Sequence, residues 1–239
     1  MRPALQGPAL LLKAADRGED DRLLTLLTPE HGRLTALARH ARGSKRRFGA
    51  ALQPFCLFHA TLRPSGAGLV FLEQALAAEF PLGNEPGLEA MAAGWLFLEL
   101  AEQLCPQSQP QAAFFELVLG GLRRLGLGKE GAPAVRLSVL WQALALEGWA
   151  PDPCLCMRCG QSKPLTGLSP GADGGICAGC WRPLDGPRVD EAAAAAWMAV
   201  AQGRPPATTP PEAEAALRRW VAHHTGRDLR SGQLEWGAG

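Results

Sequence analysis

Short apolar stretches separated by turn residues occupy the first third of the chain, a pattern typical of β-strands. Turns are predicted at 17–21, 29–32 and 64–68, because Gly is present in each and Pro in two of them. The apolar stretches predict five strands, at 9–15, 22–28, 33–42, 55–62 and 69–76. Five strands, with a short helical turn within 44–52 after the third, favour a closed barrel of the OB type. Strand count alone leaves an SH3-like barrel open.

Beyond Pro81 the apolar positions recur at helical spacing. Leu88, Met91, Trp95 and Leu98 are three or four residues apart. The same spacing predicts further helices at 112–125, 134–147, 190–201 and 211–224. We therefore predict an α+β, multi-domain protein with an N-terminal five-stranded OB-fold barrel at 1–81. An all-helical domain follows at 82–150 and 184–239, and a cysteine-bearing module interrupts it at 151–183.

Four cysteines of this module carry the strongest chemical signal in the chain. Cys156 and Cys159 form one CxxC pair, Cys177 and Cys180 form a second, and seventeen residues separate the pairs. A CxxC turn brings two thiolates to one ion, and two such turns complete the tetrahedron that zinc prefers. We predict one Zn²⁺ ion bound by these four residues.

The predicted role of this zinc is structural. Four cysteine ligands leave no coordination position for water, and none of the five histidines begins the His-x-Glu sequence of zinc deaminases. Cys154 remains open as a competing ligand, whereas Cys56 and Cys105 are isolated and are predicted to be buried thiols. Because the module has few apolar residues, metal binding would supply its folding free energy.

Sequence motifs for catalysis are missing. Residues 126–131 match GxGxxG, but a predicted helix precedes them instead of the strand that a dinucleotide site requires, which indicates a helix–helix loop. The chain contains neither a GxxxxGK[ST] phosphate loop nor a GxSxG elbow. We therefore expect a protein that is not an enzyme.

Charge is divided unevenly along the chain, although the formal net charge is only +1. Residues 1–81 contain eleven Lys and Arg against seven Asp and Glu, and the remainder contains thirteen against sixteen. No apolar run reaches the roughly 18 residues of a membrane span, and Ala9–Leu12 is too short for a signal-peptide core. We expect a cytoplasmic protein with reduced cysteines and no membrane partner.

A basic segment begins at the third predicted strand and holds no carboxylate. Its six cations are Arg33, Arg39, Arg42, Lys45, Arg46 and Arg47. The leading interpretation is a DNA-phosphate-binding face, and the alternative is a solvated strand edge protected by cations. Phe48, next to Arg47, is the one candidate ring for stacking on a base. Electrostatics should then dominate, so that single and double strands both bind.

Several segments, taken in order, resemble the RecO family of bacterial recombination mediators. The matching segments are Glu19-Asp20 with Leu23-Leu24, Thr28–Gly32, Ala38–Arg42 with Ser44, Leu52–Phe55, Cys156–Gly160, Gly174–Cys180 and Arg227–Ser231. The resemblance spans nearly the whole chain, and its specificity lies in the combination.

This resemblance implies an OB-fold, a helical domain and a zinc module in a nucleoid-associated DNA repair protein. It also implies binding to single- and double-stranded DNA, strand annealing, and recombinase loading with RecR and single-strand DNA-binding protein. The match of the basic segment also implies that Arg39, Arg42 and Lys45 contact DNA. His40 stands where the family usually has Gly, so we expect the strand to bend less there and one DNA contact to differ.

Two other classes of function remain open from the sequence. A zinc-stabilised protein-interaction scaffold without a direct DNA role predicts that the basic segment can be replaced without loss of function. A zinc hydrolase or deaminase would require mixed ligands and a metal-bound water, which the closed set of four cysteines disfavours.

Overall fold

The computed structural model describes residues 4–65 and 69–231, except for the side chains of Lys45 and Arg46. The chain divides into two compact units, separated between Lys129 and Glu130. This division reflects packing, whereas the domain limits predicted above reflect changes in sequence pattern and stay a prediction.

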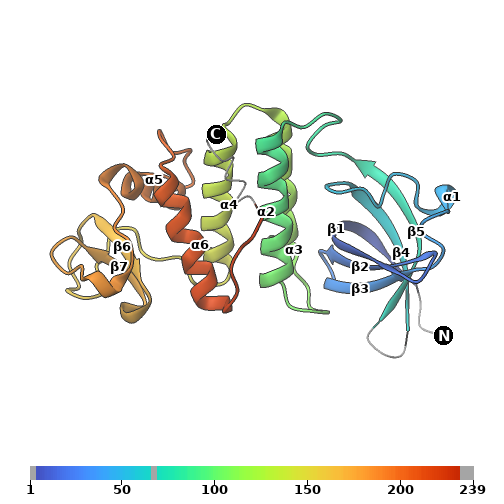
Figure 1. Ribbon diagram of the computed structural model, residues 1–239, viewed down its shortest axis with the longest axis horizontal. Helices are drawn as coiled ribbons and strands as arrows, with labels where there is room; N and C mark the ends of the chain where they lie inside the picture. The colour runs from blue at the N-terminus through green and yellow to red at the C-terminus, as the bar shows by residue number, and fades with distance from the viewer. Residues whose placement is uncertain (1–3, 66–68, 232–239) are drawn as a thin grey trace. The chain divides into compact units, whose positions relative to one another are not determined.

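The first unit begins with a closed five-stranded barrel (Figure 1). Its strands are β1 (Leu5–Arg17), β2 (Asp21–Thr28), β3 (Gly32–Ala38), β4 (Leu57–Pro64) and β5 (Val70–Glu79), with α1 (Lys45–Phe48) after β3. The strand order is β1-β2-β3-β5-β4, closed by an antiparallel β1–β4 pair and a parallel β3–β5 pair. This arrangement confirms the five predicted strands and the OB-type barrel.

Alternation along the strands fills the barrel with apolar side chains. Leu24 lies opposite Ala36 and Leu26 opposite Leu34, and all four belong to the buried core. Phe48, at the end of α1, joins this core and is 2% exposed. The hypothesis that Phe48 stacks on a base is therefore wrong, because its ring is needed to fill the barrel.

Two long helices complete the first unit, α2 (Leu88–Leu104) and α3 (Ala112–Leu127). They pack on each other, and they contact β1 and β2 respectively. Glycine allows the close approach: a Cβ at Gly32 would lie 1.9 Å from the Gln109 carbonyl oxygen, and one at Gly126 would lie 1.9 Å from that of Pro81. A bidentate ion pair between Glu79 and Arg123 adds a polar contact between β5 and α3.

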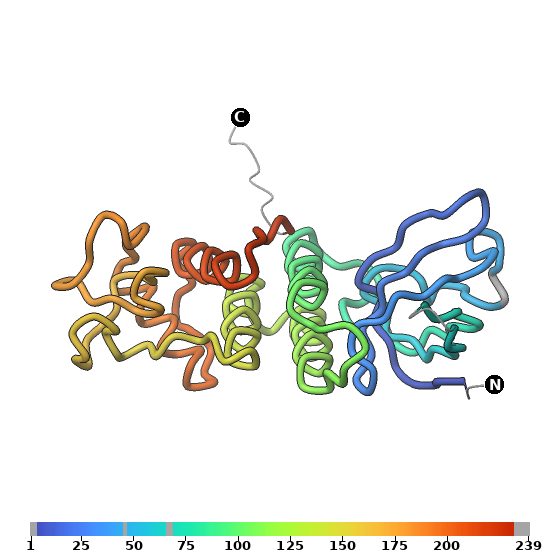
Figure 2. The backbone as a smooth tube through the Cα atoms, turned by 90° about the horizontal axis from the view of Figure 1, so that it is seen from below, coloured from blue at the N-terminus to red at the C-terminus, as the bar shows by residue number. Residues whose placement is uncertain are grey.

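The second unit is helical with a small inserted two-stranded sheet. The coils of its helices can be followed in Figure 2. Its elements are α4 (Ala132–Leu146), β6 (Leu165–Ser169), β7 (Gly174–Cys177), α5 (Glu191–Ala201) and α6 (Pro211–Thr225). Asp190 caps α5 by accepting from the Ala193 N–H at 2.8 Å. Trp197 is fully buried and donates to the Ala213 carbonyl at 3.1 Å, which joins α5 to α6.

The predicted helices are therefore confirmed, with bounds that differ by one or two residues. Residues 128–131 connect α3 to α4, so the predicted helix–helix loop at 126–131 is present but begins two residues later. Gly128 ends α3 in a left-handed conformation with φ of 63°. Within the ranges that the structure describes, every helix is too short or too polar to cross a membrane.

Candidate metal centre and nucleic-acid interface

The four cysteines of the two CxxC pairs meet in the second unit. Cys156 and Cys159 precede β6, Cys177 ends β7 and Cys180 follows it. Their sulfur atoms all lie within 4.8 Å of one another, and those of Cys159 and Cys177 are 4.0 Å apart. A tetrahedral zinc with bonds of about 2.3 Å places its sulfurs about 3.8 Å apart, so this arrangement fits one such ion.

Tight turns position each pair. The Gly160 N–H donates to the Cys156 carbonyl at 2.8 Å, and the Cys180 N–H donates to the Cys177 carbonyl at 3.0 Å. Gly160 has φ of 67°, a left-handed conformation that glycine adopts without strain. The Cys177 N–H also donates to the Cys156 sulfur at 3.4 Å, so the two turns are joined directly.

Backbone N–H groups and sulfur–sulfur contacts have opposite effects on the thiols. Burial raises the pKa of Cys156, but N–H donation from Cys177, Cys159 and Arg158 outweighs it and lowers this pKa to about 6. A hydrogen bond to the Cys159 sulfur, together with burial, raises the pKa of Cys180 to about 12. Adjacent thiolates repel one another, so a cation is required before all four lose their protons.

A partly buried ion pair supports the cysteine cluster. Asp185 accepts from Arg158 Nη1 at 2.7 Å and Nη2 at 2.6 Å, and Arg158 lies between the two cysteines of the first pair. Arg158 also donates to the carbonyl of Cys180 in the second pair. Ser169 Oγ and the Arg182 N–H complete the Asp185 contacts, each at 2.7 Å. We call these two residues the Arg158–Asp185 clamp, because they tie both cysteine turns together.

Charge pairing keeps the clamp ionised. The Arg158 guanidinium, and then the Ser169 hydroxyl, hold the pKa of Asp185 well below its usual range. The Asp185 side chain is 6% exposed, so its carboxylate is buried but fully hydrogen-bonded. Asp185 was missed from the sequence, since it lies outside the CxxC pairs and beyond the predicted end of the module.

The remaining cysteines lie outside the cluster. The Cys154 sulfur lies 3.7 Å from that of Met198, and Cys154 is not among the four grouped residues, which argues against it as a ligand. Cys56 and Cys105 are buried, which confirms the prediction for both. Burial also raises the pKa of the Cys56 thiol.

Three arginines of the basic segment lie in the β3–α1 connection and in α1, and one of them, Arg42, contacts the β1–β2 turn. Arg42 donates through its backbone N–H to the Asp20 carbonyl and through Nη1 to the Glu19 carbonyl, each at 3.2 Å. Arg47 Nη2 donates to the Arg39 carbonyl at 2.6 Å, and its Nε donates to Ser44 Oγ at 3.1 Å. We call Arg39, Arg42 and Arg47 the basic face. Hydrogen bonds from Arg42 and Arg47 stabilise the β3–α1 connection. The side chains of Arg39 and Arg42 are exposed.

The other predicted DNA-binding residues are placed differently. Arg33 is half-buried at the start of β3, where its N–H donates to the Pro106 carbonyl at 3.3 Å and its Nε is buried without a partner. At about 3.3 Å per strand residue, Arg33 is roughly 20 Å from Arg39. The structure therefore does not bring Arg33 to the basic face. The side chains of Lys45 and Arg46 lie outside the described residues.

A ring that the sequence analysis missed lies at this face. The Arg39 guanidinium lies 4.5 Å from the centroid of the Phe71 ring, which is half-buried on β5. Leu37 of β3 pairs with Phe71, and this register brings the two elements together. Strand alternation was the available signal, because Val70 and Leu72 point into the core and Phe71 must then point outward.

His40 adopts the conformation that glycine would take. Its φ is 53°, its N–H donates to Asp21 Oδ1 at 2.9 Å, and its Nδ1 lies 3.6 Å from Asp20 Oδ2. These side-chain contacts hold a left-handed turn without glycine, and the expected weaker bend and altered DNA contact stay predictions.

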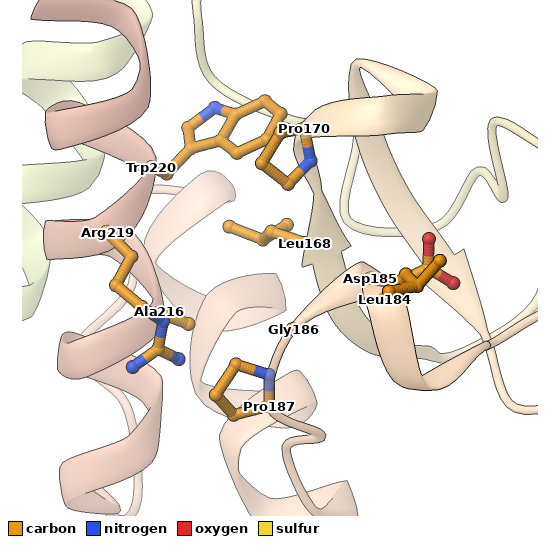
Figure 3. A pocket seen from close by; sticks show the side chains of 9 residues that line it. All are labelled: Leu168, Pro170, Leu184, Asp185, Gly186, Pro187, Ala216, Arg219 and Trp220. Carbon is orange, nitrogen blue, oxygen red and sulfur yellow. The ribbon is translucent and has the colours of Figure 1, made fainter. Parts of the chain in front are cut away.

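A small pocket lies between α6 and the segment around Leu184 in the second unit (Figure 3). Its volume is about 170 Å³, and Leu168, Pro170, Pro187 and Trp220 supply its apolar walls. Figure 3 shows the Arg219 side chain on the same α6 face, one position before Trp220. The pocket therefore combines apolar surface with a cation.

Comparisons with known proteins agree with these features. The family described as "Recombination protein O N terminal" matches residues 1–80, and "Recombination protein O C terminal" matches residues 86–233. The protein named "DNA repair protein RecO" from Anaeromyxobacter sp. (strain K) is 35% identical over 92% of this chain and 91% of its own length. Its namesakes are 36% identical over 93% of both chains in Myxococcus xanthus (strain DK1622) and 33% identical over 73% of both in Streptomyces coelicolor.

Proposed function

The chain belongs to the RecO family of DNA repair proteins, and from this premise we propose that it is a non-catalytic recombination mediator. In this role it binds single- and double-stranded DNA, promotes strand annealing, and loads recombinase together with RecR and single-strand DNA-binding protein. It acts in the cytoplasm, at the nucleoid.

The observation that carries the proposal is the basic face of the barrel. Arg39 and Arg42 are exposed, and backbone carbonyls hold the guanidinium groups of Arg42 and Arg47. Preorganised guanidinium groups bind phosphate with little further loss of side-chain entropy. The stacked Arg39–Phe71 pair adds a surface on which an unpaired base can lie.

In this proposal one zinc ion is held by Cys156, Cys159, Cys177 and Cys180 and has a structural role. The support is the fit of four sulfurs to a closed tetrahedron. When bound, the ion supplies folding free energy to the module and leaves no position for substrate.

We further propose that the acidic tail of single-strand DNA-binding protein occupies the pocket of Figure 3, with Arg219 facing its carboxylates. Arg219→Glu should weaken binding of a tail peptide in fluorescence anisotropy. Arg204→Glu, an exposed cation away from that pocket, should leave peptide binding unchanged. Equal affinity in the two variants would argue against this pocket.

Salt-dependent binding of a labelled single strand tests the proposed DNA site. The test variant replaces Arg42, Lys45, Arg46 and Arg47 with Gln. A matched control replaces four exposed cations elsewhere, Lys129, Lys163, Arg204 and Arg227. The logarithm of affinity should fall with the logarithm of salt concentration, with a slope of roughly −0.7 per phosphate contact. The test variant should have a lower affinity and a shallower slope.

The matched control is expected to behave like the wild type. If the test variant also does so while DNA binding persists, DNA lies elsewhere on the protein. If the wild type binds neither DNA nor RNA at low salt, the mediator role fails and the zinc-stabilised interaction scaffold becomes the better account.

A further inference from the structure

An apolar hollow in the first unit lies outside the sites described above. Its volume is about 360 Å³, and its walls come from the α1–β4 connection, the β5–α2 connection and α2. Three rings line it, those of Phe55, Phe80 and Trp95. Phe80 is 36% exposed and Trp95 is 40% exposed, so two large aromatic side chains remain open to solvent. We call this hollow the aromatic groove.

The rings of the aromatic groove are held in place by a specific backbone arrangement. Phe55 has φ of 63°, a left-handed conformation that is rare for a bulky residue. Its ring lies against Gly94 of α2, where a Cβ would approach to 2.8 Å. The ring centroids of Phe55 and Trp95 are 4.9 Å apart in an edge-on arrangement. A strained residue and a glycine inside a helix thus keep Trp95 at the surface.

Apolar exposure continues along α2 beyond the groove. Leu88, Met91 and Trp95 are three and four residues apart and share one helix face, and Leu88 is 58% exposed. Trp95 forms the wall at the end of this stripe. An amphipathic helix that binds a hydrophobic groove has its apolar residues three and four positions apart. The exposed apolar residues of α2 have the same spacing, so such a helix can pack along them.

The segments that line the aromatic groove carry charge of a single sign. Residues 80–111 contain four Glu and no Lys or Arg. Glu85 stands between two residues that line the groove, and Glu89 lies in the first turn of α2 next to Leu88. Both are exposed, and neither forms an ion pair within the described part of the chain. These carboxylates repel phosphate and attract cationic side chains.

We propose that the aromatic groove docks a protein partner through an amphipathic segment that carries Lys or Arg beside apolar anchors. The apolar anchors fill the hollow between Phe80 and Trp95, and the cations face Glu85 and Glu89. This surface shares no residue with the basic face, and its role does not depend on the proposed DNA binding. A nucleic acid is the disfavoured occupant, because no Lys or Arg lines the aromatic groove, and Arg123, which reaches Glu79 beside Phe80, is already paired with that carboxylate.

Fluorescence anisotropy of labelled peptides on the full-length protein tests the proposal. The probe is a short Leu/Lys peptide with apolar residues at helical spacing, and its Leu/Glu counterpart is the charge control. Trp95→Ala should lower the affinity for the Leu/Lys peptide by about tenfold or more, as truncation of a Trp anchor does in protein interfaces. The double variant Glu85→Lys with Glu89→Lys should also lower this affinity, although neither residue lines the groove.

Matched variants separate docking from general effects. Leu127→Ala removes another exposed apolar side chain of the first unit, 66% exposed, and Glu116→Lys reverses another exposed carboxylate. Both should bind the Leu/Lys peptide like the wild type.

Equal peptide affinity in Trp95→Ala and the wild type overturns the proposal, as does equal binding of the Leu/Glu peptide. Loss of single-strand DNA binding in Trp95→Ala, at unchanged Leu/Lys affinity, would make the groove a nucleic-acid site instead. If Trp95→Ala fails to fold, the double Glu variant decides alone.

Discussion

The barrel and the cysteine module both contain antiparallel β-strands, but different interactions stabilise them. The barrel encloses a continuous apolar core that contains Leu24, Leu26 and Phe48. The strands of the module, β6 and β7, have only five and four residues, and two polar side chains are buried there, Ser169 at the end of β6 and Asp185 after β7. Two strands of this length are marginal without further support.

This difference determines how each region responds to change. The free energy of the barrel is distributed over many apolar contacts, so the loss of one side chain removes only a part of it. If the proposed zinc ion is bound, the free energy of the module is concentrated in one group of four thiolates and one ion pair. We therefore expect graded effects in the barrel and all-or-none effects in the module.

Cys159→Ser should have the largest effect and lead to unfolding of the module. The cluster loses one of four ligands, and structural zinc contributes about 10–16 kcal/mol in small peptides. Zinc content by atomic absorption and melting by circular dichroism measure the outcome. Cys154→Ser is the control, since Cys154 lies outside the cluster. Stoichiometric loss of zinc with unchanged melting would show that the ion is not structural.

Leu24→Ala should destabilise the barrel by about 2–5 kcal/mol, because it leaves a cavity where Leu24 is fully buried. Urea unfolding of the metal-loaded protein measures this change. The effect should persist in a chelator, whereas the Cys159→Ser effect should disappear there. A chelator-dependent Leu24→Ala effect would remove the contrast between the two regions.

Asp185→Asn should lower zinc affinity by about 10- to 100-fold, the usual effect of removing a residue that orients metal ligands. The Arg158–Asp185 clamp joins the two cysteine turns, and an amide cannot accept two N–H donors from Arg158 while also serving Ser169 and Arg182. Competition with a chromophoric chelator measures the affinity.

Asp173→Asn provides the matched control for the clamp. Asp173 is exposed, with φ of 51°, a conformation that Asn also accepts, so its zinc affinity should equal that of the wild type. If Asp185→Asn binds zinc as tightly as Asp173→Asn, the clamp stabilises the fold without acting on the metal site.

Periodic patterns and cysteine spacing made much of this molecule predictable. Alternation of Leu24 and Leu26 on β2, and the spacing of Leu88 and Met91 on α2, are local signals that survive folding. Asp185 could not be found this way, because its partners come from segments up to 27 residues away. Phe48 was misassigned because its neighbour Arg47 is cationic, whereas its burial depends on how the strands close around it.

Phe71→Leu should have the smallest effect and is specific to unpaired DNA. Base stacking contributes about 1–3 kcal/mol per base, and Phe71 is only half-exposed beneath Arg39, so a loss near the lower limit, about fivefold, is expected for single strands. Duplex affinity should not change, because paired bases are not free to stack. Phe80→Leu, which removes an exposed ring away from the basic face, is the control. Fluorescence anisotropy with matched single- and double-stranded oligonucleotides measures the loss of affinity for each substrate. An equal loss for both substrates would mean that Phe71 acts by positioning Arg39 for phosphate and not by stacking.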